Sequence, residues 1–132
     1  KPLVAVDQDM GEMPDVVQTM AAVACFAEGT TVMRNIAHLA YKESNRIVDT
    51  ANELKRLGAK VEFGSDYLAV TGGCDLKGAT VETYDDHRMA MSMALIGSRV
   101  SNVIINNAQV VSKSFPSYFD KLAEIGIRSE KV

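Results

Sequence analysis

The chain has 132 residues, of which 47 % are hydrophobic and 23 % charged, so it can form one globular domain or part of a larger one. A formal net charge of −3 does not favour a general binder of nucleic acid or of membrane surfaces. There is no signal-peptide pattern and no bilayer-spanning apolar stretch, so we expect a cytoplasmic protein. Cys25 and Cys74 are expected to be free thiols, with a disulfide as the less favoured alternative. The chain opens on Lys1 rather than on methionine, which suggests an excised fragment.

Strand and helix signals alternate along the chain. β-branched residues between turn signals predict strands at residues 3–6, 30–35, 61–63, 67–71, 80–83 and 102–106. Apolar residues at helical spacing predict helices at about residues 14–27, 43–57, 86–96 and 115–125. The first of these helices is apolar nearly all round and is therefore expected to be buried. Residues 7–13, which hold three acids, are expected to form a loop.

An internal repeat with an offset of 71 residues relates the two parts of the chain. Residues of one type recur in the same order: Asp15 and Asp86, Met20 and Met91, Asn35 and Asn106, Lys42 and Lys113. Each copy must bury its apolar helix against a neighbour, which favours a layered α/β or α+β domain. The repeat units are expected at roughly residues 1–78 and 79–132. Their equivalent loops are expected to open at one end of the domain.

The first cluster of candidate functional residues runs from Lys42 to Arg46. Glu43 and Arg46 are three residues apart in the first turn of an expected helix, where unpaired backbone N–H groups favour anions. One interpretation places both side chains in a binding site. The other makes Glu43 an ordinary helix-start acid and Arg46 its ion-pair partner, and the residues alone favour this second interpretation.

The second cluster surrounds the start of the third helix, which either Asp85 or Asp86 can cap. Arg88 then lies in the first turn, where the helix dipole disfavours a cation. An anion held jointly by Arg88 and the helix N-terminus would explain this placement. Alternatively, Arg88 pairs with Asp85, and His87 is an ordinary surface residue.

The third cluster places Lys113 just before the last expected helix, at the position equivalent to Lys42. A lone lysine is usually solvated, so the interpretation depends on the clusters occurring together. Together they provide four cations for a small, multiply anionic substrate: Lys42, Arg46, Arg88 and Lys113. Asp15 and Glu43 are then the candidates for general base and general acid. No phosphate loop, dinucleotide fingerprint, nucleophile elbow or metal-ligand spacing is present.

The chain resembles the EPSP synthase family at runs spread over nearly its whole length, in the order of the family. The matching runs are Pro14-Asp15, Arg34–Ile36, Lys42–Arg46, Tyr84–Met91 and Lys113–Phe119. Family members are longer and resemble two domains, each of three βαβαββ units with buried helices, around a cleft. The resemblance implies that this chain is the C-terminal part of one domain, with about two units. One departure is Asn45, where the family often has an acid.

The resemblance also implies an activity in the shikimate pathway without any metal or organic cofactor. The enolpyruvyl group of phosphoenolpyruvate moves to the 5-hydroxyl of shikimate 3-phosphate by addition and then elimination, with release of phosphate. Asp15 resembles the base for the hydroxyl, and Glu43 resembles the group that exchanges a proton with the methylene carbon. The implied contacts to shikimate 3-phosphate are Asp15, Asn35 and Lys42. The implied phosphoenolpyruvate contacts are Arg46, Arg88 and Lys113, with His87 beside them.

Two alternatives remain beside this interpretation. One is an enzyme like UDP-N-acetylglucosamine enolpyruvyl transferase, and the other is a ligand-binding module of the same fold without catalysis. For the leading interpretation, the expected partners are the two small substrates and the rest of the enzyme chain, with no nucleic acid and no membrane. The protein is expected to be a monomer, and the isolated fragment is expected to be inactive.

Overall fold

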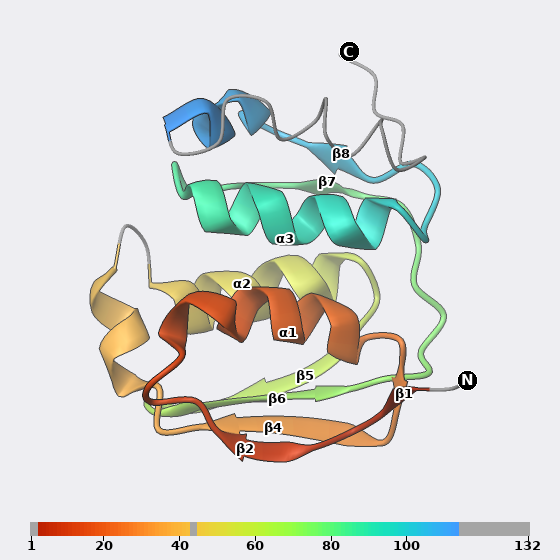
Figure 1. Cartoon of the computed structure of the whole chain (residues 1–132). Coiled ribbons are helices and arrows are strands. Elements are labelled where there is room, and N and C mark those ends of the chain that lie inside the picture. Colours follow the sequence, from red (N-terminus) through yellow and green to blue (C-terminus); the bar gives the residue numbers. More distant parts are fainter. Residues whose placement is uncertain (1–2, 43–44, 114–132) are drawn as a thin grey trace.

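The computed structural model describes residues 3–42 and 45–113 (Figure 1). The first part contains β1 (Leu3–Val4), β2 (Asp7–Asp9), the 3-10 helix η1 (Pro14–Val16), α1 (Val17–Ala24), β3 (Ala27–Glu28), β4 (Thr30–Arg34) and the 3-10 helix η2 (Ala37–Tyr41). The second part contains α2 (Arg46–Arg56), β5 (Lys60–Phe63), β6 (Tyr67–Thr71), β7 (Thr80–Val81), α3 (His87–Gly97), β8 (Ile104–Ile105) and the 3-10 helix η3 (Ala108–Lys113). The predicted helix at 115–125 lies outside the described residues.

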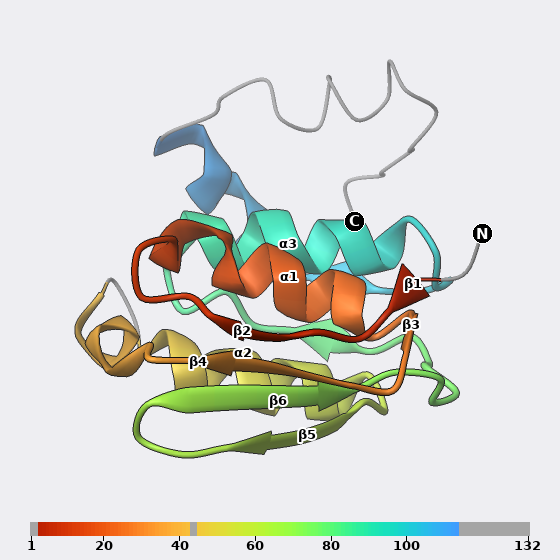
Figure 2. The same ribbon diagram turned by 60° about the horizontal axis from the view of Figure 1, so that its bottom comes forward.

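The main sheet has the strand order β2-β4-β6-β5 and carries α1 and α2 on one face (Figures 1 and 2). β2 runs parallel to β4, and the pairs β4–β6 and β6–β5 are antiparallel. Side chains alternate across the sheet, so that Met33 and Leu68 are buried under the helices. The order β2-α1-β4-α2-β5-β6 is one βαβαββ unit with its helices on the buried side, which confirms the predicted fold.

Strand β2 was expected to be part of a loop, and this prediction was wrong. Asp7–Asp9 pairs with Val32–Arg34 at the edge of the sheet, and all three residues of β2 are exposed. Charged side chains are suited to an edge strand, because they discourage pairing with another chain. The same charges removed the apolar alternation by which strands are recognised in a sequence.

Helix α1 packs closely on α3 because small side chains line the contact. Ala21 and Ala22 are fully or almost fully buried, and the side chain of Gln18 reaches Met89 of α3, with 4.0 Å between Nε2 and Sδ. Val23 is nevertheless 42 % exposed, so the prediction that this helix is buried on nearly all sides was wrong for one face. The methionines Met89 and Met93 of α3 are fully buried in the core, and Met91 is half-buried.

The internal repeat has a structural counterpart. β7 and β8 form a parallel pair with α3 between them in sequence, and η3 follows, just as β2, α1, β4 and η2 follow one another. The equivalent asparagines make equivalent contacts. Asn35 donates its amide to Asp9 Oδ1 at 3.2 Å, and Asn106 donates to Glu82 Oε1 at 2.8 Å. In both copies an asparagine after the second strand thus binds an acid of the first strand or just after it.

Helix α2 begins later than expected, at Arg46 rather than at residue 43. Asn45 is its N-cap, and the Asn45 side chain accepts a hydrogen bond from the backbone N–H of Val48 at 3.3 Å. Asparagine is among the favoured N-cap residues, so helix α2 is capped here without an acid. After the helix, Gly58 has a φ of 95°, a left-handed conformation that glycine adopts without strain.

Cys25 and Cys74 are free thiols. None of the helices described in residues 3–42 and 45–113 has the length and hydrophobicity of a transmembrane span.

Candidate active site

The starts of α1, α2 and α3 lie at the same end of the molecule, where η2 and η3 also lie (Figure 1). Each helix presents its unpaired backbone N–H groups and the positive end of its dipole at that end. An anion there is stabilised even before any side chain contributes. Three of the loops that the repeat predicted to open at one end lead into these helices, and the fourth precedes the helix expected at 115–125, which lies outside the described residues.

Three predicted site residues meet at this end. Asp15, in the short helix before α1, lies between two arginines. Its Oδ1 is 3.7 Å from Nη1 of Arg46, and its Oδ2 is 3.5 Å from Nη2 of Arg88. Asp15 is 58 % exposed and Arg88 37 % exposed, whereas Arg46 is only 3 % exposed. The cluster thus combines a solvent-accessible carboxylate (Asp15) and guanidinium (Arg88) with a buried guanidinium (Arg46).

Asp86 belongs to the same cluster, although the sequence analysis considered it only as a possible helix cap. It is completely buried and binds Arg46 at two points: Arg46 Nε donates to Oδ2 at 2.9 Å, and Nη2 donates to Oδ1 at 3.2 Å. Asp86 is also the N-cap of α3, because Oδ1 accepts the backbone N–H of Arg88 at 3.0 Å. The repeat offered a signal, since Asp86 is the counterpart of Asp15 and both contact Arg46.

The ion pairs described at this site join residues that lie far apart in the sequence. Arg88 pairs with Asp15, and the nearby carboxylate of Asp85 accepts a hydrogen bond from Asn107 at 3.3 Å. Arg46 pairs with Asp86 and Asp15. Its expected partner Glu43 lies outside the described residues.

The remaining predicted residues are less tightly defined. Lys42 is exposed at the end of η2, and His87 is the half-buried first residue of α3. Asn35 follows β4 with a φ of 63° and is bonded to Asp9. Lys113 is the last described residue, and its side chain is outside the description.

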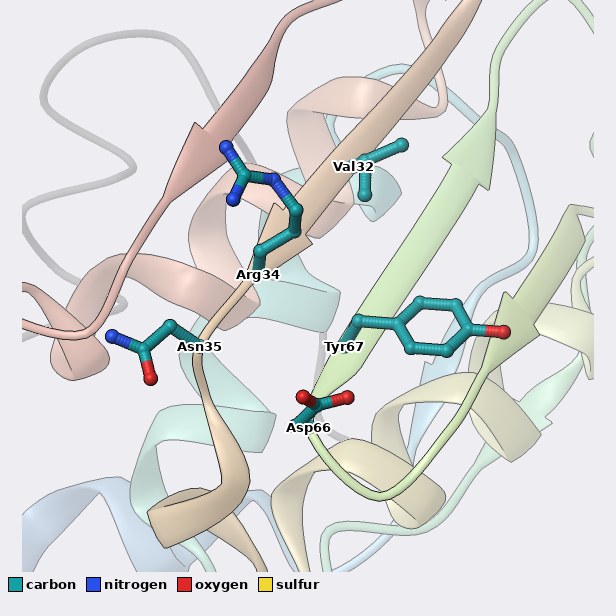
Figure 3. A pocket seen from close by; sticks show the side chains of 5 residues that line it. All are labelled: Val32, Arg34, Asn35, Asp66 and Tyr67. Carbon is teal, nitrogen blue, oxygen red and sulfur yellow. The ribbon is translucent and has the colours of Figure 1, made fainter.

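A shallow cavity of about 330 Å³ lies elsewhere, on the outer face of the sheet (Figure 3). It is lined by Val32, Arg34, Asn35, Asp66 and Tyr67. Arg34 forms an exposed ion pair with Asp7. Hydrogen bonds from the backbone N–H of Gly11 and from the Asn35 amide lower the pKa of the nearby Asp9. The lining includes neither Asp15 nor its two arginines, so we do not assign the anion site to this cavity. No three metal-binding side chains come together among the described residues.

Comparisons with known proteins show which family the chain resembles. The family model of EPSP synthase (3-phosphoshikimate 1-carboxyvinyltransferase) matches residues 1–122. A 3-phosphoshikimate 1-carboxyvinyltransferase of Photobacterium profundum is 48 % identical over 123 residues, which are 93 % of this chain and 29 % of that protein. The Colwellia psychrerythraea protein of the same name is 46 % identical, over 95 % of this chain and 29 % of its own length.

Solved structures show the same fold. An EPSP synthase from Acinetobacter baumannii superposes with a TM-score of 0.88 and 28 % identity, over 96 % of this chain and 31 % of that chain. The enolpyruvyl transferase NikO from Streptomyces tendae shares the fold with a TM-score of 0.74 at 24 % identity, over 96 % of this chain and 29 % of that chain.

The chain belongs to the EPSP synthase family, because the family model covers almost all of it. It spans less than a third of the length of the relatives that it matches.

Proposed function

We propose that this chain forms one face of the active site of an enzyme that transfers the enolpyruvyl group of phosphoenolpyruvate to the 5-hydroxyl of shikimate 3-phosphate. The observation that carries the proposal is the cluster of Asp15, Arg46 and Arg88 where three helices begin. Its relatives at 46 % to 48 % identity bear the name of that activity. The two substrates carry several negative charges, and converging cations offset the repulsion between them.

Asp15 is the proposed general base. It takes the proton of the 5-hydroxyl while that oxygen bonds to C2 of phosphoenolpyruvate, and Glu43 gives a proton to the methylene carbon. The resulting tetrahedral intermediate then loses phosphate, and Glu43 takes a proton back from the methyl group. Because Asp15 is 58 % exposed and both its oxygens face arginines, it is oriented yet open to a substrate hydroxyl.

Arg88 and Arg46 are the proposed contacts to phosphoenolpyruvate, and they differ in what they can do. Arg46 is fixed by Asp86 in a buried position and supplies charge at a defined place. Arg88 is more exposed and can form a two-point bond with a carboxylate or phosphate. Lys113 and His87 are proposed to complete this contact, and Lys42 and Asn35 to bind shikimate 3-phosphate.

The rest of the active site is proposed to come from the remainder of a longer chain. We place two repeat units of one domain at roughly residues 1–78 and 79–132, as the C-terminal part of that domain. The complete enzyme is proposed to be a cytoplasmic monomer whose reaction needs no metal or organic cofactor. The isolated 132 residues are expected to be inactive, because they span only 29 % of the length of their relatives and the rest of the site is proposed to lie in the remainder.

The test is release of phosphate from phosphoenolpyruvate by the full-length protein, with shikimate 3-phosphate as acceptor. UDP-N-acetylglucosamine as acceptor tests the related enolpyruvyl transfer in the same assay. Turnover with shikimate 3-phosphate but not with UDP-N-acetylglucosamine as acceptor supports the proposal. Turnover only with the nucleotide sugar would contradict the substrate, and no turnover with either would contradict the activity. Normal turnover by the isolated chain would contradict the need for a second half.

A further inference from the structure

Glu53 is a completely buried carboxylate of α2 for which the proposed reaction has no use. A buried charge is costly unless it is paired and hydrogen-bonded. Glu53 has three described partners. Its Oε2 accepts the hydroxyl of Tyr84 at 2.5 Å, its Oε1 accepts the backbone N–H of Glu82 at 2.8 Å, and Nε of Arg56 is 3.3 Å from Oε1. Two of these partners lie outside its own helix, in the segment between β7 and α3.

That segment, residues 82–85, is a corner in an unusual backbone conformation. Tyr84 has a φ of 54° and Asp85 a φ of 58°. The left-handed region costs about 1–2 kcal/mol for an L-residue, so two in succession persist only if their surroundings hold them. Asn106 and Asn107 hold the corner from the end of β8, through Glu82 at 2.8 Å and Asp85 at 3.3 Å. Glu53 contacts the corner from α2, through Tyr84 and the backbone of Glu82.

Tyr84 is a stable hydrogen-bond donor to Glu53. Burial and the hydrogen bond to Glu53 raise the pKa of Tyr84, so the phenol keeps its proton and remains a donor to Glu53 through the neutral range. A hydrogen bond from a neutral donor to a carboxylate is stronger than one between neutral groups.

The corner leads directly into the arginine site. Asp86 is the next residue, and from its position it binds Arg46 at two points and caps the helix that carries Arg88. We propose that Glu53 is a positioning residue for the anion site: through Tyr84 and the backbone of Glu82 it fixes the corner that seats Asp86 against Arg46. The inference rests on the proposed function for the identity of the anion, phosphoenolpyruvate.

The test uses Tyr84→Phe in the full-length protein, with Tyr67→Phe as the matched control. Tyr67 loses the same hydroxyl on the outer face of the sheet, away from the corner (Figure 3). Tyr84→Phe is expected to raise the KM for phosphoenolpyruvate about tenfold, the effect of one lost charge-assisted hydrogen bond. The KM for shikimate 3-phosphate should rise less, and hydrogen exchange should accelerate in a peptide covering residues 82–88. Tyr67→Phe should change none of these.

The outcomes separate the two proposals. A purely structural role would lower the melting temperature of Tyr84→Phe and leave the KM for phosphoenolpyruvate unchanged in the folded enzyme; that result overturns the inference. If Tyr84→Phe does not fold, the same measurements are made on Glu53→Gln. Glutamine has the same shape as glutamate without the charge. If the wild-type protein transfers no enolpyruvyl group, the proposed function fails. The Glu53 inference is then judged by the exchange of residues 82–88 and by calorimetric binding of inorganic phosphate, which should both change in Tyr84→Phe only.

Discussion

Arg46 and Asp86 form a two-point ion pair between the first residue of α2 and the N-cap of α3, with exposures of 3 % and 0 %. The pair ties together two helix starts that are 40 residues apart in the chain. It also leaves Arg46 Nη1 within 3.7 Å of Asp15, so one guanidinium links the packing of the core to the candidate base. Stability and site geometry are therefore expected to respond to the same substitutions.

Asp86→Ala is expected to destabilise the protein strongly. Removing one partner of a buried ion pair leaves the other charge uncompensated and costs about 3–5 kcal/mol. The free energy of unfolding from urea titrations measures this loss. Asp7→Ala is the control, because it breaks an exposed pair with Arg34 and should cost about 0–1 kcal/mol. Equal losses for the two variants would contradict the structural importance of the buried pair.

Asp15→Asn is expected to reduce kcat by about 100-fold or more, the range of a positioned general base. The KM values should change much less, because the amide keeps the shape of the side chain. Asp66→Asn, on the turn at the outer sheet face, is the control and should keep wild-type turnover. The measurement is steady-state phosphate release by the full-length protein, and unchanged kcat in Asp15→Asn would remove this residue from the base role.

Arg88→Lys is expected to raise the KM for phosphoenolpyruvate about tenfold with a small effect on stability. An ammonium group cannot reproduce the two-point bond of a guanidinium, which accounts for a loss of this size. Arg88 is 37 % exposed and its pair with Asp15 is loose at 3.5 Å, so the fold should tolerate the change. Arg34→Lys, at an exposed arginine of the sheet, should leave this KM unchanged. A KM that does not respond in Arg88→Lys would place the substrate elsewhere.

Much of the fold could be predicted from the sequence because its signals are local. Helix α2 has an apolar stripe with Gly58 after it, and β5 and β6 flank a Gly64-containing turn, so these elements appear close to where they were expected. The 3-10 helices η2 and η3 were not expected, because such short elements have no period to detect. Strand β2 depends on pairing with β4, which is a property of the folded chain rather than of Asp7–Asp9.

The site was predictable in part. The repeat predicted that the loops at Asp15 and Asp86 open at one end of the domain, and Arg88, two residues after Asp86, lies 3.5 Å from Asp15. Asp86 was recognised only as a possible cap, since nothing local shows that Arg46 lies opposite it. Glu53 was missed for a similar reason. It shares a helix face with Thr50 and Leu57, which are fully buried, and a charged residue on such a face was the available signal.

Cys25 is expected to react with an alkylating reagent much more slowly than Cys74 at neutral pH. Cys25 is buried, and burial raises its pKa from 9.0 to about 11. Because the thiolate is the reactive form, labelling of Cys25 should be suppressed at pH 8 and increase as the pH rises toward 11. The same shift means that the stability contributed by the neutral thiol is present below pH 9 and is lost as the pH rises through 11. Mass spectrometry after iodoacetamide treatment measures the labelling. Cys74→Ser should lose nearly all of it, and comparable labelling of Cys25 in the native protein would contradict its burial.

Gly72→Ala is expected to destabilise the protein by several kcal/mol. A Cβ at this position would lie 1.8 Å from the backbone oxygen of Ala27 and 2.7 Å from that of Ala24, so the end of α1 or the strand would have to move. Overpacking of this kind typically costs about 1–3 kcal/mol, and a clash with backbone belongs at the upper end or beyond.

Gly97→Ala is the matched control for this clash. Gly97 ends α3, and its Cβ would meet Val103 at 3.6 Å, which is ordinary van der Waals contact. Because alanine also favours the helix by about 0.5–1 kcal/mol, this variant should be as stable as the wild type or slightly more stable. Thermal unfolding of both variants tests the close approach of the 71–73 segment to α1. If Gly72→Ala had the same melting temperature as the wild type, that close approach would not exist. The packing of the sheet against α1 would then differ from the one described.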